Sequence, residues 1–286
     1  MKEHFFIFLK GMVIGVAELI PGVSGGTIAL ILGIYERFIS SISNININFL
    51  RGIFSANRKS VWQESDLNFL LTLVFGMVVT ALTLSSVIIF FLKNHPFFLK
   101  AFFSGLLLTS LLFKPLKPEV FDKKFFIGFL IACLVISLAW NFTPNKFEQV
   151  SYFYIFFGGF IGVCAFILPG TSGSFVLLLL GIYELIILAL KDLNVIILSS
   201  LFAGCITGLL LFINIVKKAY KDYPSHLLGF FYSLVLLSVP LLWKSGKWKI
   251  LFPENSTTYF EIILGVIFGI VIIFLLQKLS TTSQDI

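Results

Sequence analysis

Pro21-Gly22-Val23-Ser24-Gly25-Gly26 opens a motif that closes, after an apolar run, with Gly33-Ile34-Tyr35-Glu36. The pattern returns 148 residues later as Pro169-Gly170-Thr171-Ser172-Gly173-Ser174 and Gly181-Ile182-Tyr183-Glu184. Ten of the sixteen aligned positions are identical, and they include Pro, Gly, Ser, Tyr and Glu rather than aliphatic residues alone. Similarity of this kind indicates an internal duplication, so each half of the chain should hold one copy of the same unit.

The composition is that of a membrane protein. Hydrophobic residues make up 58% of the chain and charged residues only 12%, whereas soluble domains carry roughly a quarter charged residues. A crossing helix needs ~20 apolar residues, so the chain has room for several crossings. The apolar N-terminal stretch is interrupted by Lys10 and lacks a small-x-small cleavage site, which predicts folded structure there rather than a signal peptide. We predict an all-α polytopic membrane protein.

Three apolar stretches follow each motif and are predicted to span the membrane. They cover about 67–92, 98–113 and 124–141 in the first half, and about 194–216, 226–243 and 259–276 in the second. The flanks of each Pro-Gly pair are too short for a full crossing, and Pro and Gly disfavour a continuous helix. We therefore predict re-entrant, broken-helix hairpins over 5–39 and 152–190, each with one half-helix after its break, at 24–39 and 172–190. The two repeats are then 1–143 and 144–286.

An odd number of crossings lies between the two motifs, which sets their relative orientation. With three crossings between them, the second hairpin must enter from the opposite face, and the repeats are inverted. Inverted repeats with broken helices are typical of secondary transporters, whose substrate site lies near the midplane. Of the 21 Lys and Arg residues, fourteen fall on the side that holds both termini. The positive-inside rule then predicts N-in and C-in, with the cluster Lys244, Lys247 and Lys249 as the misfit.

The start of the half-helix after each break is a candidate anion site. Its first N–H groups have no intrahelical partner, and the positive end of the helix dipole points at the ligand. Glycines let successive N–H groups turn inward, and nearby hydroxyls add donors, which suits a phosphate or a carboxylate. Two such ends approaching from opposite faces would enclose one anion. The predicted donors are Ser24, Gly25, Gly26, Thr27, Ser172, Gly173 and Ser174; the alternative is that each motif merely breaks and caps a helix.

Charged residues near the motifs are further candidates. Glu18 lies three residues before Pro21 in an apolar run, and intramembrane carboxyls are candidates for proton coupling or gating. The alternative is that Glu18 caps neighbouring N–H groups. Glu36 and Glu184 would lie ~18 Å along a continuous helix from each break. That distance places them near the membrane interface, as anchors or gate partners. Arg37 is predicted on the cytoplasmic face, as a contact for a lipid head-group phosphate.

The remaining residue types argue against a metal or cofactor site. Cys133, Cys164 and Cys205 lack pairing or metal-ligand spacing, and the three His residues are scattered. We expect no metal, no cofactor and no catalytic residues. Nothing resembles a nucleic-acid-binding module, and the net charge of +7 is attributed to topology and to contact with anionic lipid. The sequence leaves the oligomeric state open.

The two motifs resemble those of one family. Glu18-Leu-Ile-Pro-Gly-Val-Ser-Gly-Gly-Thr27, Leu168-Pro-Gly-Thr-Ser-Gly-Ser-Phe175 and the two Gly-Ile-Tyr-Glu endings are similar to the polyprenyl-phosphate, or undecaprenyl-phosphate, transporters. Similarity in length and hydropathy covers nearly the whole chain. The resemblance implies a lipid flippase of the cell membrane that returns undecaprenyl phosphate from the outer to the cytoplasmic leaflet. The carrier is thereby recycled for cell-envelope and peptidoglycan-precursor synthesis, with the lipid and the bilayer as partners and no enzymatic step.

Two other functions stay open at this point. A membrane polyprenyl-pyrophosphate phosphatase also uses inverted re-entrant hairpins, but it needs acid–base residues beside the nucleophile. Neither motif has a His or a cluster of carboxylates nearby. The other alternative is a transporter of a small soluble anion. Lateral access between helices, rather than an aqueous vestibule, would distinguish a lipid from a soluble cargo.

Overall fold

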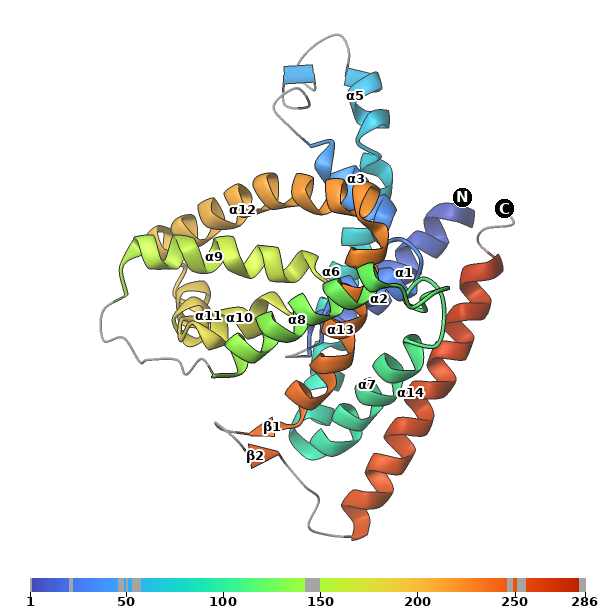
Figure 1. Cartoon of the computed structure of the whole chain (residues 1–286). Coiled ribbons are helices and arrows are strands. Elements are labelled where there is room, and N and C mark those ends of the chain that lie inside the picture. The colour runs from blue at the N-terminus through green and yellow to red at the C-terminus, as the bar shows by residue number, and fades with distance from the viewer. Residues whose placement is uncertain are drawn as a thin grey trace.

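The computed structural model describes residues 2–20, 23–45, 49, 51–52, 58–141, 150–245, 249–250 and 256–282. The first half contains α1 (Lys2–Glu18), α2 (Gly25–Ile31), α3 (Tyr35–Ser43), α5 (Arg58–Glu64), α6 (Leu67–Asn94), α7 (Pro96–Ser110) and α8 (Lys123–Asn141). The second contains α9 (Tyr152–Ile167), α10 (Gly173–Leu179), α11 (Tyr183–Lys191), α12 (Val195–Asp222), α13 (Pro224–Leu242) and α14 (Ser256–Thr282). Figure 1 shows this helical architecture, to which β1 (Lys244–Ser245) and β2 (Lys249–Ile250) add one small antiparallel pair.

Several helices match membrane spans. Among the residues that the structure describes, four helices are long and apolar enough to cross a bilayer: α6, α12, α13 and the segment Thr258–Leu276 of α14. Large apolar side chains on their outer surfaces are exposed, for example Leu82 and Ile215, and lipid is the solvent that suits such surfaces. The chain is thus a multi-pass membrane protein. The predicted span at 98–113 is realised as α7, whose 15 residues are shorter than a full crossing needs.

The two halves repeat the same local structure. Helices α6 and α12 each have 28 residues, and their bounds differ by 128. Each of the two helices ends shortly before a proline that starts the next helix. The missing N–H of proline costs nothing there, because the first N–H groups of a helix have no partner within it. The residues before these prolines share one backbone conformation, with φ −134° and ψ 50° at His95 and φ −134° and ψ 49° at Tyr223. The two halves therefore repeat the same turn of the chain after these helices.

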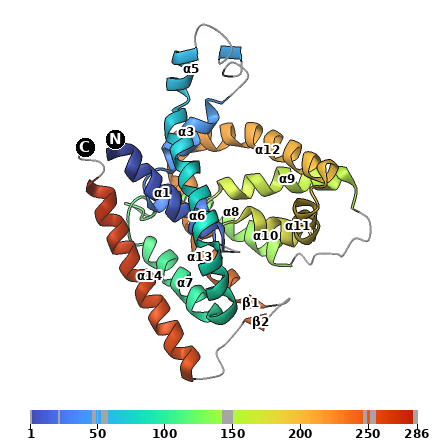
Figure 2. The ribbon, with the colours of Figure 1, turned by 180° about the vertical axis from the view of Figure 1, so that it is seen from behind.

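Helix pairing follows the same repeat. Within the halves, α1 packs on α6 and α9 packs on α12, whereas α7 packs on α14 and α13 packs on α8 across the halves (Figures 1 and 2). Gly128 of α8 lies against the carbonyl of His226, and Gly265 of α14 lies against the carbonyl of Phe98. These carbonyls belong to positions 128 residues apart. Small residues permit such close approach of helices in a membrane.

The arm that follows each Pro-Gly pair is divided, contrary to the prediction. Helices α2 and α3 meet at an angle of 118°, so 24–39 is not one half-helix. Gly33 has φ 68°, and its N–H donates to the Leu30 carbonyl at 3.0 Å. The N–H of Ile34 donates to the Ala29 carbonyl at 3.0 Å. A glycine in the left-handed region with these two bonds ends a helix.

The second arm, 172–190, is divided in the same way. Gly181 has φ 72° and donates to the Leu178 carbonyl at 3.0 Å, and Ile182 donates to the Leu177 carbonyl at 3.1 Å. The Gly-Ile-Tyr-Glu sequence is therefore a helix stop followed by a new helix. Glu36 and Glu184 lie in the first turn of α3 and α11, not three turns along a continuous helix.

Polar contacts join several of the segments that connect or end the helices. Arg37 joins Glu3 and Asp66 in an ion-pair cluster, which connects the N-terminal segment with the loop 37–66. Lys217 donates to the Ser43 hydroxyl at 2.8 Å. The Ser225 hydroxyl donates to Asp122 and holds the pKa of that carboxyl below its usual range. Lys247, part of the predicted misfit, lies outside the described residues.

Candidate functional site

The two motifs meet in the structure, at the start of α2 and the turn before α10. The Ser24 hydroxyl donates to the Leu168 carbonyl at 3.2 Å, and Thr27 Oγ1 accepts the Gly170 N–H at 2.6 Å. Both hydroxyls are buried, so they contribute bonds that water does not replace. The first motif thus holds the backbone of the second; Pro21 and Gly22 lie outside the described residues.

Tyr35 adds a contact that the sequence interpretation missed. Its hydroxyl donates to the Ile167 carbonyl at 3.2 Å, and its ring lies edge-on to Phe231 of α13. Tyr35 is fully buried, although the neighbouring Glu36 is exposed. The duplicated Gly-Ile-Tyr-Glu sequence was a signal for this residue, because Gly33 turns the chain so that the tyrosine points back towards the second motif.

Glu18 closes the N-terminus of α2. Its Oε1 accepts the Gly25 N–H at 2.7 Å, and a Cβ placed on Gly25 would collide with the same carboxyl. Ser24 occupies the N-cap position but makes no side-chain cap bond. Of the two roles predicted for Glu18, the structure therefore shows the cap, while proton coupling stays a prediction.

The second motif has the same backbone but no such cap. Ser172 precedes α10 with φ −113° and ψ 132°, close to φ −105° and ψ 123° at Ser24. Phe166 stands where the first half has Glu18. Because α10 begins at Gly173, the N–H groups of its first turn have no helical carbonyl behind them. The hydroxyls of Ser172 and Ser174 lie 2.8 Å apart at this end.

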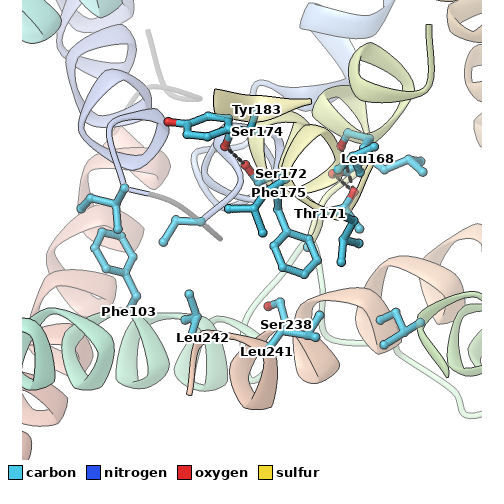
Figure 3. Close-up of a pocket in the computed structure, with 18 of the residues that line it drawn as sticks. Phe103, Leu168, Thr171, Ser172, Ser174, Phe175, Tyr183, Ser238, Leu241 and Leu242 are labelled. Atoms are coloured by element: carbon cyan, nitrogen blue, oxygen red, sulfur yellow. Dashed lines mark hydrogen bonds between the residues drawn. The ribbon is translucent and has the colours of Figure 1, made fainter. Parts of the chain in front are cut away.

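A cavity of about 800 Å³ lies against the second motif. Figure 3 shows Thr171, Ser172 and Ser174 on one wall and Ser238 of α13 on the opposite wall. Most of the lining is aliphatic or aromatic and comes from α7, α8, α9, α10 and α13. Its polar side chains are Lys100, Thr171, Ser172, Ser174, Tyr183 and Ser238. Of the predicted donors, Ser172 and Ser174 line the cavity, whereas Ser24, Gly25, Gly26, Thr27 and Gly173 do not.

The cavity reaches the outer surface between apolar residues. Val135 and Leu138 of α8 line it and are 47% and 66% exposed. Ile161 of α9 and Leu178 of α10 also line it and are 44% and 48% exposed. A rim of exposed aliphatic side chains suits contact with lipid chains better than contact with water. Lateral access of this kind is expected for a lipid cargo rather than for a soluble anion.

The other charged candidates lie away from this cavity. Arg37 donates to Asp66 through Nε at 2.6 Å and to Glu3 through Nη1 at 2.9 Å, and its guanidinium lies 4.4 Å from the Phe69 ring centroid. Glu36 and Glu184 are exposed and are absent from the cavity lining. The structure therefore brings the two motifs together but leaves these three charged residues at the surface.

The lining determines what the cavity can bind. Hydroxyl and N–H donors gather at the second motif, and one ammonium group lies on α7. Apart from Tyr183 and Ser238, the rest of the wall is apolar. Such a distribution suits a molecule with an anionic head and a long apolar part. The volume of the cavity falls within the ~300–1,000 Å³ typical of small-molecule sites. The long apolar part of such a ligand would therefore extend out of the cavity through the rim.

Comparison with known proteins now identifies the family. Residues 14–255 match the undecaprenyl phosphate translocase-like family. The chain belongs to this family. A member of similar sequence is the polyprenyl-phosphate transporter of Vibrio cholerae, 35% identical over 249 residues, which are 86% of this chain and 79% of that protein. The polyprenyl-phosphate transporter of Staphylococcus aureus is 28% identical over 297 residues, with 96% and 97% covered.

The family assignment confirms the resemblance that the two motifs indicated. Both motifs and all the helices that form the cavity wall fall within the matched residues of this undecaprenyl phosphate translocase-like chain. No solved structure matches the chain. The geometry of the motifs and of the cavity therefore comes from the present structure alone.

Proposed function

We propose that this protein moves a polyprenyl phosphate, in particular undecaprenyl phosphate, from the outer to the cytoplasmic leaflet so that the carrier is used again. The observation that carries this proposal is the cavity, which combines a hydroxyl-lined end with an apolar rim open to the membrane. The names of the two bacterial relatives support the same cargo. A phosphate head would cross inside the protein while the isoprenoid chain stays in lipid.

The phosphate is proposed to bind at the second motif. Its oxygens would accept hydrogen bonds from Ser172 and Ser174 and from the N–H groups that begin α10 at Gly173. Such bonds to a charged acceptor are the strong ones. The first motif supports the site indirectly, because Ser24 and Thr27 hold the turn at Leu168 and Gly170. The anion is thus bound by one motif and positioned by the other.

The inverted orientation of the two repeats, 1–143 and 144–286, is part of the proposal. The shared backbone conformations and the cross-paired helices support the duplication. The positive-inside rule supports N-in and C-in. In a cysteine-free background, single cysteines at Lys93 and Lys221 should react with a membrane-impermeant reagent from opposite sides. Labelling of both from one side would contradict this topology.

Hydrolysis is the alternative reaction. None of the described residues that line the cavity is His, Asp or Glu, whereas cleavage of a pyrophosphate needs a general acid or base. We expect purified protein to release no phosphate from undecaprenyl pyrophosphate. Release that disappears in Ser172→Ala would favour the phosphatase instead.

The decisive test is reconstitution in liposomes with labelled undecaprenyl phosphate placed in one leaflet. Accessibility of the label to a membrane-impermeant phosphatase reports how fast it changes leaflet. We expect rapid exchange with the protein and slow exchange in protein-free liposomes. Equal rates in the two samples would refute the proposed function.

A further inference from the structure

Lys100 is the one charged side chain among the described residues that line the cavity. It lies in the first turns of α7, three residues before Phe103, so both point to one face of that helix. Figure 3 shows Phe103 on the cavity wall across from Ser172 and Ser174. The ammonium therefore belongs to the same cavity as the hydroxyls but comes from a different helix.

The turn of α7 that carries Lys100 is fixed by a chain of hydrogen bonds. Ser104 Oγ donates to the Lys100 carbonyl at 2.7 Å, and Trp243 Nε1 donates to Ser104 Oγ at 2.9 Å. Trp243 follows Leu242, which also lines the cavity. The backbone of Lys100 is thus tied to the end of α13, and the side chain has a defined starting point at the cavity wall.

No acidic side chain balances this ammonium within the described part of the chain. The cavity lining contains no Asp or Glu, and Glu261 of α14 is paired with His95 at 2.8 Å. Lys100 is half-buried, and a cation held away from water without a partner is costly in a membrane. Its counterpart in the repeat, 128 residues later, is Leu228, so the duplicated fold does not require a cation here.

We propose that the Lys100 ammonium is the counter-charge for the lipid phosphate while the head group occupies the cavity. This inference rests on the proposed function and assigns a residue to it. The hydroxyls of Ser172 and Ser174 orient the phosphate oxygens, and the lysine neutralises charge as a compact, mobile cation. A cation on α7 and donors on α10 would bind the phosphate from two helices that belong to different halves of the chain.

Binding of labelled undecaprenyl phosphate to the protein in nanodiscs tests this role. Lys100→Gln should bind at least about tenfold more weakly, since a lost charge-assisted bond to phosphate is of that order. Lys100→Arg should stay close to wild type. The matched control is Lys93→Gln. Lys93 lies in the last turn of α6, shortly before α7 begins, is exposed and does not line the cavity. Lys93→Gln should bind like wild type.

Uncharged undecaprenol separates a charge effect from a structural one. It should bind equally to wild type and Lys100→Gln. Wild-type affinity of Lys100→Gln for the phosphate would refute the role of Lys100 and show that its side chain extends to the interface instead. Equal losses for the phosphate and the alcohol would also refute it. Failure of wild type to bind the phosphate would overturn the proposed function itself.

Discussion

The two copies of the motif share a backbone and differ in what surrounds them. In the first copy, a glutamate accepts the helix N–H, and the Ser24 and Thr27 hydroxyls bond to the other copy. In the second copy, a phenylalanine replaces the glutamate, and the serine hydroxyls lie at a cavity. In the proposed function, the first copy supports the second, and the second copy binds the phosphate. Glu18 and its counterpart Phe166 are one of the sequence differences between the two copies.

The largest effect is expected where the two copies join. Gly170 has φ 82°, and a Cβ there would lie 2.4 Å from the Leu234 backbone. Left-handed backbone and overpacking each cost about 1–3 kcal/mol, so Gly170→Ala should lose about 3 kcal/mol or more of stability. Thermal unfolding in detergent measures this loss. Gly162→Ala is the control, because its Cβ would meet Leu177 at an ordinary 3.5 Å. Similar melting temperatures for the two variants would contradict the close packing of Gly170 against the Leu234 backbone.

Replacing Phe166 by the glutamate of the first copy should weaken phosphate binding at the second copy. Phe166→Glu places a carboxyl where Glu18 stands in the first copy, within reach of the Gly173 N–H. That carboxyl would occupy the donors and repel the phosphate, so affinity for undecaprenyl phosphate should fall at least about tenfold, as for loss of a charged hydrogen bond. Phe166→Gln introduces a side chain of the same size as glutamate but without the charge, and it should bind the phosphate more tightly than Phe166→Glu. Unchanged binding by Phe166→Glu would place the phosphate elsewhere.

Removing serine hydroxyls from each motif should separate phosphate binding by the second motif from structural support by the first. Ser172→Ala with Ser174→Ala should weaken phosphate binding by about 10- to 100-fold, the range for bonds to a charged group. Ser24→Ala should instead lower stability by about 1 kcal/mol, the size of one neutral hydrogen bond, and leave affinity nearly unchanged. Titration in nanodiscs and thermal melting of each variant provide the two readouts. An equal loss of affinity in the Ser172/Ser174 double variant and in Ser24→Ala would show that both motifs contribute directly to phosphate binding.

The smallest effect is expected at the surface cluster of Arg37. Its ion pairs with Glu3 and Asp66 are partly exposed, and such pairs contribute about 0.2–1 kcal/mol each. Arg37→Gln should therefore shift the melting temperature slightly and leave phosphate affinity unchanged. A large loss of affinity would restore Arg37 as a head-group contact and weaken the case for the cavity.

The sequence predicted the helical membrane class, the duplication and the family because these depend on composition and on residues in register. The six stretches predicted as spans all correspond to helices. The break at Gly33 and Gly181 was missed, because an apolar run continues up to each glycine and resembles one helix. The sequence did not reveal that only the second motif lines the cavity with its hydroxyls, because burial depends on partners distant in the chain. Lys100 gave no local signal, since only the packing of α7 brings it to the cavity.

The cross-pairing of α7 with α14 and of α8 with α13 has a consequence for biogenesis. Gly105 of α7 lies against the backbone of Val266, and Gly269 of α14 lies against that of Phe102. When the ribosome has made only the first half, α7 has no such partner, and its small-residue face must wait in lipid or against the insertion machinery. The pairing of α7 is therefore completed only after α14 has been synthesised, and a chain released before α14 would leave α7 without this partner.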